Sequence, residues 1–330
     1  MTEPREKPTK ARRRSALPLS LFGIVSLSLL FLFLYDSQQS LTLVNEGLLL
    51  CFSRVVPALF PFMVLSSMIV SSGILSPLSR LLAPPCRRLL GVGGESGCVW
   101  ILGLLCGFPV AASSGVELYR SGRIGYHELR RLLLFANNPS LSFLLGGVGS
   151  ALYGDVRIGV LLCLVTLLSS LILGVGIRFF TGSAEGDPPE ALAPREEPLS
   201  VPLLFCRSVT SSVSALLSVL GFVVFFYTLT GVLSHVVGGA DTVSPSSALL
   251  LGFFEMTGGM ARAALCEPPL SYLLAAFLAG FSGLSVHCQI ASICAPARVS
   301  LAPYLLAKTA QGVLNLLLMG VLLRFCGFLG

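Results

Sequence analysis

Residues 98–131 read CVWILGLLCGFPVAASSGVELYRSGRIGYHELRR, and this stretch decides the fold. Its apolar run is interrupted by Gly107-Phe108-Pro109, and small polar residues and Glu117 follow. Glycine and proline both disturb a regular helix. The segment therefore either crosses a membrane as a kinked helix or enters it and turns back. The path of every later segment depends on which of the two holds.

The whole chain is strongly apolar. Of its 330 residues, 54% are hydrophobic and 12% charged, which excludes an ordinary soluble domain and indicates a polytopic membrane protein. About 20 apolar residues cross a bilayer as a helix. Apolar segments without strand-like alternation predict an all-α fold. Nine such segments occur, at residues 17–35, 55–75, 98–116, 132–152, 158–180, 209–237, 248–264, 272–293 and 302–325.

The net charge of +6 does not indicate nucleic acid as a partner, because the basic residues are distributed as membrane orientation requires. Six of them lie within residues 5–14. We therefore expect a basic cytoplasmic tail at residues 1–16 and, because no cleavage pattern follows, an uncleaved transmembrane anchor at residues 17–36. The expected partner is the lipid bilayer.

No sequence pattern indicates metal, cofactor or enzyme chemistry. The ten cysteines occur singly, without CxxC spacing, and we interpret them as small residues that fill helix contacts. Phosphate-loop, HExxH and GxSxG motifs are missing from the sequence. We therefore expect no metal site, no cofactor and no enzymatic activity.

The arginine distribution favours a segment that turns back at Gly107-Phe108-Pro109. Lys and Arg prefer the cytoplasmic side of a membrane. If residues 98–116 crossed, four arginines would lie in a short outer loop, whereas a re-entrant hairpin keeps them in the cytoplasm. These arginines are Arg120, Arg123, Arg130 and Arg131. A kinked spanning helix remains the alternative.

The same argument applies to residues 248–264, where we expect a turn at Thr257-Gly258-Gly259. A second re-entrant hairpin delivers Arg298 and Lys308 to the cytoplasm. Three basic residues remain on or near the outer side, namely Arg157, Arg262 and Arg324.

The segments after the anchor fall into two sets with matching order. SGILS, CGFPVAASSG and FANNPSLSF, which begin at residues 72, 106 and 135, align with TGVLS, LGFFEMTGGM and LAGFSGLSV, which begin at residues 230, 251 and 278. With one re-entrant hairpin and one broken helix per set, each half crosses three times, which inverts the second half. We therefore predict two inverted repeats, at residues 45–180 and 205–330, joined by an acidic, proline-rich cytoplasmic linker at residues 181–204.

Several pieces of these repeats resemble a known family. VVPALFPFMVLSSMIVSSG, GLLCGFPVAASSG, FANNPSLSFLLGGVG, GFFEMTGG and LAGFSGLSVHCQIASI resemble YlbJ-type sporulation integral membrane proteins, which belong to the nucleoside-recognition or Gate domain group. That group is similar to concentrative nucleoside transporters and to the membrane part of ferrous-iron transporters. The resemblance implies Gate-like repeats, a multi-pass protein of the bacterial cell membrane and a role in spore formation, in cortex assembly. It implies no established substrate.

Polar residues at the predicted turns and breaks are the candidate ligands for a small polar solute or coupling ion. They are Gly107, Pro109, Ser113, Ser114, Asn137, Asn138, Ser140, Glu255, Thr257, Ser282, Ser285 and Gln289. Ionisable or amide groups within a membrane usually face a cavity or a partner.

Each candidate also has a structural interpretation. The asparagines could be polar contacts between helices, and Glu255 could be a buried partner of Arg262. Glu117 is better explained as an interfacial residue near Arg120, and His287 as a packed side chain.

Two functions remain open at this stage. The first is a secondary-transporter-like carrier for a small polar solute or ion. The second is a non-transporting scaffold or interaction protein of spore assembly with a relict carrier fold. The sequence does not determine the substrate, the coupling ion or whether the chain forms a homo-oligomer.

Overall fold

The computed structural model describes residues 10–182, 200–236 and 243–325, and within these ranges the chain forms helices and no strands. Four helices are long and apolar enough to cross a membrane, or up to six if each of two bent pairs counts as one span. The predicted all-α polytopic membrane fold is confirmed. Residues 1–9 of the predicted tail and residues 183–199 of the predicted linker lie outside the described ranges.

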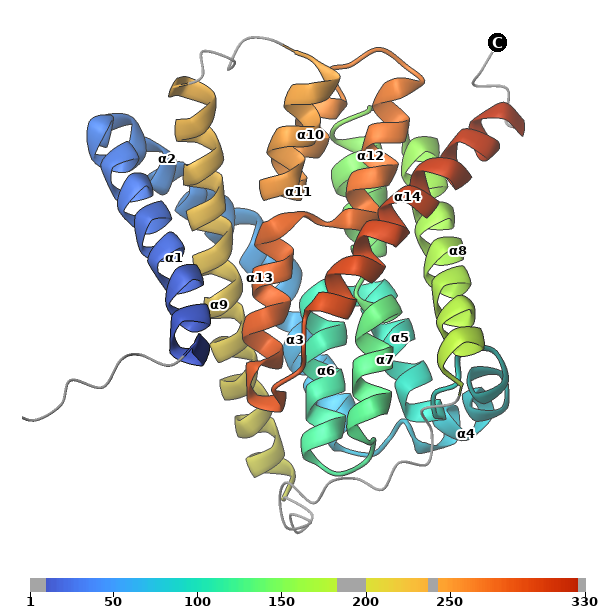
Figure 1. The fold of residues 1–330 in the computed structure, drawn as a ribbon. Coiled ribbons are helices and arrows are strands. Elements are labelled where there is room, and N and C mark those ends of the chain that lie inside the picture. The colour runs from blue at the N-terminus through green and yellow to red at the C-terminus, as the bar shows by residue number, and fades with distance from the viewer. Residues whose placement is uncertain (1–9, 183–199, 237–242, 326–330) are drawn as a thin grey trace, which may run out of the picture.

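The first helices of the bundle are bent relative to one another (Figure 1). The helix α1 begins within the predicted tail, and Asp36 caps the next helix by accepting from the amide of Gln39 at 3.2 Å. The chain therefore stays helical directly after the predicted anchor. The bounds are α1 Lys10–Tyr35, α2 Ser37–Leu50, η1 Cys51–Val55 and α3 Val56–Ser71.

A helical hairpin and a broken helix follow in the lower half of Figure 1. The helices α5 and α6 are joined at Gly107, and α7 ends at a break over residues 137–140 before the chain continues upward. The bounds are α4 Ser76–Pro85, η2 Cys86–Leu90, α5 Gly94–Cys106, α6 Phe108–Arg120, α7 Tyr126–Ala136, η3 Phe143–Ser150 and α8 Val156–Thr181.

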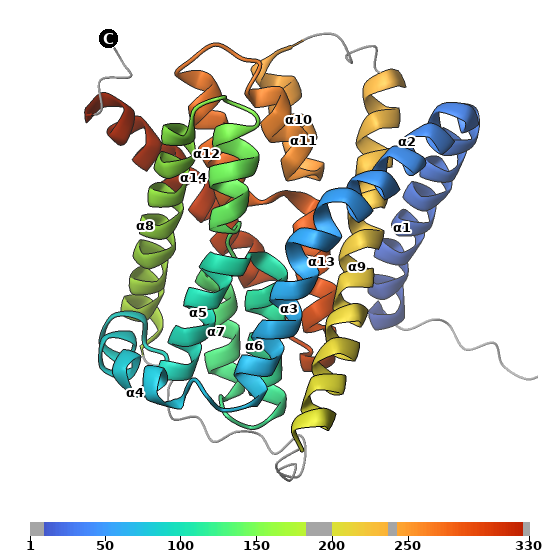
Figure 2. The ribbon, with the colours of Figure 1, turned by 180° about the vertical axis from the view of Figure 1, so that it is seen from behind.

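After α9, which spans the height of the molecule, a second hairpin occupies the upper half (Figures 1 and 2). The helices α10 and α11 meet at Glu255, and α12 and α13 meet at Ser282. The bounds are α9 Val201–Val236, α10 Pro245–Phe254, α11 Met256–Ala263, α12 Leu270–Phe281, α13 Gly283–Cys294, η4 Ala295–Ala297 and α14 Ala302–Phe325.

Each hairpin turn contacts the break of the helix that follows it. A Cβ atom on Gly107, whose φ is +98°, would lie 3.4 Å from the Cβ of Ser140 at the first break. A Cβ atom on Gly283, whose φ is +81°, would lie 2.7 Å from the carbonyl oxygen of Gly252 in α10. Glycine permits both the backbone conformation and the close approach. The two halves therefore have the same kind of internal contact, while their inverted relation stays a prediction.

The second turn differs from its predicted place. We expected it at Thr257-Gly258-Gly259, but α10 ends at Phe254 and α11 begins at Met256, so the turn lies at Glu255. The Glu255 carboxylate accepts from the amides of Thr257 at 2.9 Å and Gly258 at 2.6 Å. This capping starts the new helix before the glycines, because it satisfies amides that have no partner within the helix.

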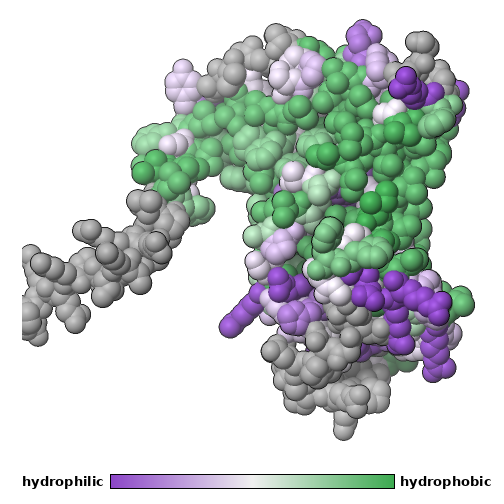
Figure 3. All heavy atoms as spheres, turned by 45° about the vertical axis from the view of Figure 1, so that its right-hand side comes forward, coloured by the Kyte–Doolittle hydropathy of each residue, from purple (hydrophilic) through white to green (hydrophobic). Residues whose placement is uncertain are grey.

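The surface of the molecule has the pattern of a protein embedded in lipid. Figure 3 shows an apolar surface between a band of hydrophilic side chains at the lower end and a smaller group at the upper end. Large side chains such as Phe22, Leu217 and Leu306 are exposed on it. Apolar surface of this extent is stable in contact with lipid rather than water. The chain is a multi-pass membrane protein.

Candidate functional site

The candidate site is centred on Lys308, which is fully buried in α14. Its ammonium donates to the carbonyl oxygen of Asn137 at 2.6 Å and to Oε1 of Gln311 at 2.7 Å. None of the ion pairs in the described ranges includes it. An ammonium has three N–H groups, so one donor remains beyond these two acceptors. Lys308 is therefore a buried amino group held by two neutral oxygens.

This position corrects a prediction. The topology argument delivered Lys308 to the cytoplasm, whereas the structure places it in the core of the bundle. The predicted segment already began at residue 302, where α14 begins, so Lys308 lies six residues and about 9 Å inside the helix and not at the end to which the charge argument assigned it.

The first helix break exposes the carbonyl that Lys308 uses. Pro139 has no amide hydrogen, so the carbonyl of Phe135 loses the partner that a continuous helix would give it. Asn138 Nδ2 and Ser170 Oγ donate to that carbonyl instead, at 2.9 Å and 2.8 Å. Asn137 Nδ2 bonds the carbonyl of Leu133 at 2.9 Å. The break is thus stabilised by its own asparagines, and the Asn137 carbonyl is left for Lys308.

Further polar side chains connect this break to α8 and α14. Gln311 Nε2 donates to Oδ1 of Asn138 at 2.7 Å and to Ser169 Oγ at 3.3 Å. Asn315 Nδ2 donates to the carbonyl of Ala276 in α12 at 3.0 Å. Lys308, Gln311 and Asn315 are spaced by three and four residues and so lie on one face of α14. This face joins segments from both halves of the chain.

The second break also contributes to the site. His287 in α13 lies with Nδ1 3.4 Å from the hydroxyl of Tyr304, one helical turn before Lys308 on α14. Gln289 donates to Ser285 at 3.3 Å within α13. Ser282 occupies the break itself, with a φ of +79°. Lys308 also lies 6.0 Å from the ring centroid of Phe108, the first residue of α6. The first hairpin and both broken helices therefore meet around α14.

Several buried polar atoms near the breaks have no hydrogen-bond partner among the described residues. They include Asn137 Oδ1, Ser282 Oγ, His287 Nε2 and Asn315 Oδ1. Buried polar atoms in folded proteins are normally paired, so a cluster of exceptions calls for an explanation. Together with the remaining donor of Lys308, these atoms offer both donors and acceptors to a small polar ligand.

The predicted candidates divide into those that join this cluster and those that do not. Asn137 and Asn138 form its first half, and Ser140 caps the continuing helix by accepting from the amide of Phe143 at 3.2 Å. Ser113 instead donates to the carbonyl of Val110 within α6. Pro109 and Ser114 are buried in the same helix.

Two predicted acidic residues have local structural contacts. Glu255 caps α11 as described above, and Thr257 beside it is exposed. Glu117 accepts from Ser67 at 3.3 Å and from Ser71, both in α3, so it connects α3 to α6.

The sequence reading missed Lys308, Gln311 and Asn315. The signal was present: three polar residues spaced by three and four lie within an apolar helix, which is also the spacing of Ser282, Ser285 and Gln289. The charge argument instead assigned Lys308 to the cytoplasmic side of the membrane.

Comparison with known proteins agrees with this membrane architecture. The chain is similar to the sporulation integral membrane protein YlbJ of Bacillus subtilis (strain 168), with 29% identity over 332 residues, covering 89% of this chain and 81% of that protein. The chain is thus similar to YlbJ over most of its length. No family model matches the sequence. No solved structure matches it either.

The similarity to YlbJ extends over most of the chain, so it takes in both halves of the bundle. The YlbJ-type resemblance inferred from the motifs is confirmed. Membership of the wider Gate domain group stays a prediction, as do the domain boundaries drawn from it.

Proposed function

We propose that this protein is a secondary-transporter-like carrier for a small polar solute in a membrane of a sporulating bacterium. The sporulation role is supported by the name of its relative, a sporulation integral membrane protein. The carrier role is supported by one observation above all: a buried ammonium, Lys308, lies where helices break and polar atoms are unpartnered. Transporters commonly place solute sites at broken helices near the bilayer midplane.

Energetics favour a binding role for this ammonium. Burying a charged group without an opposite charge costs several kcal/mol, and an apolar residue of similar volume would stabilise a helix contact better. Intramembrane ionisable groups are accordingly functional by default. A solute that accepts hydrogen bonds from Lys308 and donates to Asn137 Oδ1 or His287 Nε2 would satisfy these groups.

A scaffold role is the second candidate function, and the hydrogen bonds of Asn138 favour it. Its amide group already bonds Phe135 and Gln311, so part of the cluster has a structural role in holding helices together. A pure scaffold, however, would not need a charge at Lys308.

Substitution of Lys308 separates the two functions. Lys308→Met keeps a long unbranched side chain and removes the charge. Vesicles containing the wild-type protein or the variant would be incubated with a defined mixture of polar metabolites, and their contents compared by mass spectrometry. We expect at least one solute to enter wild-type vesicles and to be excluded from vesicles with Lys308→Met.

The matched control is Arg120→Gln, which removes an exposed charge at the end of α6. It should transport like the wild type. Identical contents in wild-type, Lys308→Met and protein-free vesicles, at equal protein levels, would favour the scaffold.

A further inference from the structure

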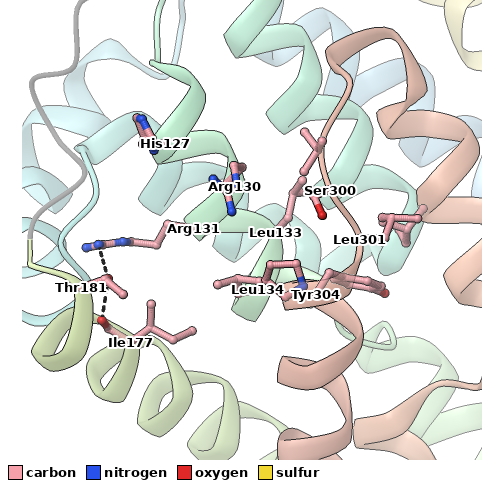
Figure 4. A pocket seen from close by; sticks show the side chains of 13 residues that line it. His127, Arg130, Arg131, Leu133, Leu134, Ile177, Thr181, Ser300, Leu301 and Tyr304 are labelled. Atoms are coloured by element: carbon pink, nitrogen blue, oxygen red, sulfur yellow. Dashed lines mark hydrogen bonds between the residues drawn. The ribbon is translucent and has the colours of Figure 1, made fainter. Parts of the chain in front are cut away.

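A cavity of about 330 Å³ opens between α7, α8 and α14, below the Lys308 cluster (Figure 4). His127, Arg130 and Arg131 of α7 line it, together with Thr181 and Tyr304. No acidic side chain is among its lining residues. The volume is in the range of small-molecule sites. The cavity therefore has the size of a ligand site and a positive lining.

The neighbouring residues Arg130 and Arg131 differ in burial and in the contacts that they make. Arg131 is buried, and its guanidinium donates to the carbonyls of Gly91 and Gly182 and to Thr181 Oγ1, the last at 2.6 Å. It is therefore a fixed part of the wall. Arg130 is half-buried and rests 5.7 Å from the ring centroid of Tyr126. None of the ion pairs in the described part of the chain includes Arg130. Its planar donor array is suited to a carboxylate or phosphate group.

The cavity leads toward Lys308 along two helices. Leu133 on α7 and Tyr304 on α14 line it, and each lies four residues before a member of the cluster, Asn137 and Lys308 respectively. Four residues of helix correspond to about 6 Å. Asn137 and Lys308 are in direct contact at 2.6 Å. Tyr304 is buried and lines the cavity, whereas Lys308 does not line it.

We infer that this cavity binds the phosphate or carboxylate group of a small anion, with Arg130 at its mouth and Lys308 as the deeper charge. The inference rests on the proposed carrier function and assigns the class of solute. Positive charge at both depths lowers the electrostatic cost of moving an anion toward the centre of the bundle, and an arriving anion gives Lys308 the opposite charge that it lacks.

The test measures binding rather than transport. Purified full-length protein in phosphatidylcholine nanodiscs would be titrated with inorganic phosphate, succinate or choline at constant ionic strength, with the shift in thermal unfolding midpoint as the readout. We expect phosphate or succinate to raise the midpoint and choline to have no effect. Arg130→Gln should weaken anion binding about tenfold, as expected for the loss of a charge-assisted contact.

Arg120→Gln is the matched control, because Arg120 is an exposed arginine at the same end of the molecule and does not line the cavity. It should bind the anion like the wild type. A second series in nanodiscs containing phosphatidylglycerol identifies the source of the group. If this lipid stabilises the wild type but not Arg130→Gln, while soluble anions have no effect, the ligand group belongs to a lipid headgroup.

The outcomes also separate this inference from the carrier proposal. Anion binding that depends on Arg130, without transport of any anion, supports the site and overturns the carrier. Transport of a neutral or cationic solute, with no stabilisation by phosphate, succinate or phosphatidylglycerol, overturns the site and leaves the carrier standing. Equal stabilisation of the wild type and Arg130→Gln overturns the site as well.

Discussion

At the scale of single residues, Pro139 explains why the centre of the molecule is polar. Its missing amide leaves the carbonyl of Phe135 without a helical partner, and Asn138 and Ser170 supply the donors. Side chains from two segments therefore replace the backbone hydrogen bond that the break removes. The carbonyl of Asn137 is released by the same break and contacts Lys308 at 2.6 Å.

Asn138→Leu tests this arrangement. An apolar side chain is cheap in lipid, so contact with lipid alone would leave the variant stable. In the structure the change leaves Gln311 Nε2 without its 2.7 Å acceptor and Phe135 without one of its donors. We now expect a loss of about 1–3 kcal/mol of stability, measured as denaturation in detergent micelles.

The control for Asn138→Leu is the double variant with Gln311→Leu. The double variant should lose less stability than the sum of the two single variants, because the bond between the two side chains is lost only once, whereas the Lys308 acceptor on Gln311 is lost in both backgrounds. Additive losses in the double variant would contradict the pairing.

At the scale of elements, each hairpin turn is fitted to a helix break by a glycine. Gly283, at φ +81°, begins α13 and lies against the carbonyl of Gly252 in α10. Gly107, at φ +98°, lies against Ser140. The backbone angle disfavours any side chain at both positions, and at Gly283 the contact with Gly252 disfavours one as well.

Gly283→Ala should therefore destabilise the protein more than Gly73→Ala. Both glycines have positive φ, but a Cβ on Gly73 meets nothing within 4 Å, whereas one on Gly283 lies 2.7 Å from a backbone oxygen. The strain of the left-handed conformation, about 1–2 kcal/mol, is common to both. The difference between the thermal unfolding midpoints of the two variants measures how strongly the close contact at Gly283 disfavours a side chain. Equal midpoints would show that the neighbouring backbone accommodates the added methyl group without loss of stability.

At the scale of the whole molecule, charge is divided between two ends. The helices α4, η2, α6 and α7 and the connection between α6 and α7 carry a group of arginines. The helices α4, α6 and α7 lie in the lower half of Figure 1, and α1 begins in that half. Of the basic residues that strained the predicted topology, Arg157 is paired with Asp155 at 2.8 Å. This distribution predicts that the lower end and the N-terminus face the cytoplasm.

Cysteine labelling in intact cells checks this orientation. In a background without native cysteines, Arg120→Cys should resist an impermeant reagent and Glu267→Cys should react, since both side chains are exposed and lie at opposite ends. Arg123 is a poorer probe, because it bonds Glu95 and the carbonyl of Val70. Efficient external labelling of Arg120→Cys would reverse the predicted topology.

The sequence by itself determined the class of the protein and the places where its helices are interrupted. Apolar segment length, Gly107 and the Asn137-Asn138-Pro139 break are local properties, so they can be read without knowing what packs against them. The second turn was misplaced by two residues because its position depends on a side-chain cap at Glu255, which the glycines of α11 obscured.

Only the tertiary structure decided which distant residues meet at those helix interruptions. Lys308 and Asn137 are 171 residues apart in the chain, and they meet because α14 packs across the end of α7. The charge argument assigned this lysine to the cytoplasmic side, because it considers how basic residues are distributed along the chain and not which helix face they occupy. Burial of that lysine depends on the packing of helices from both halves, which no local pattern contains.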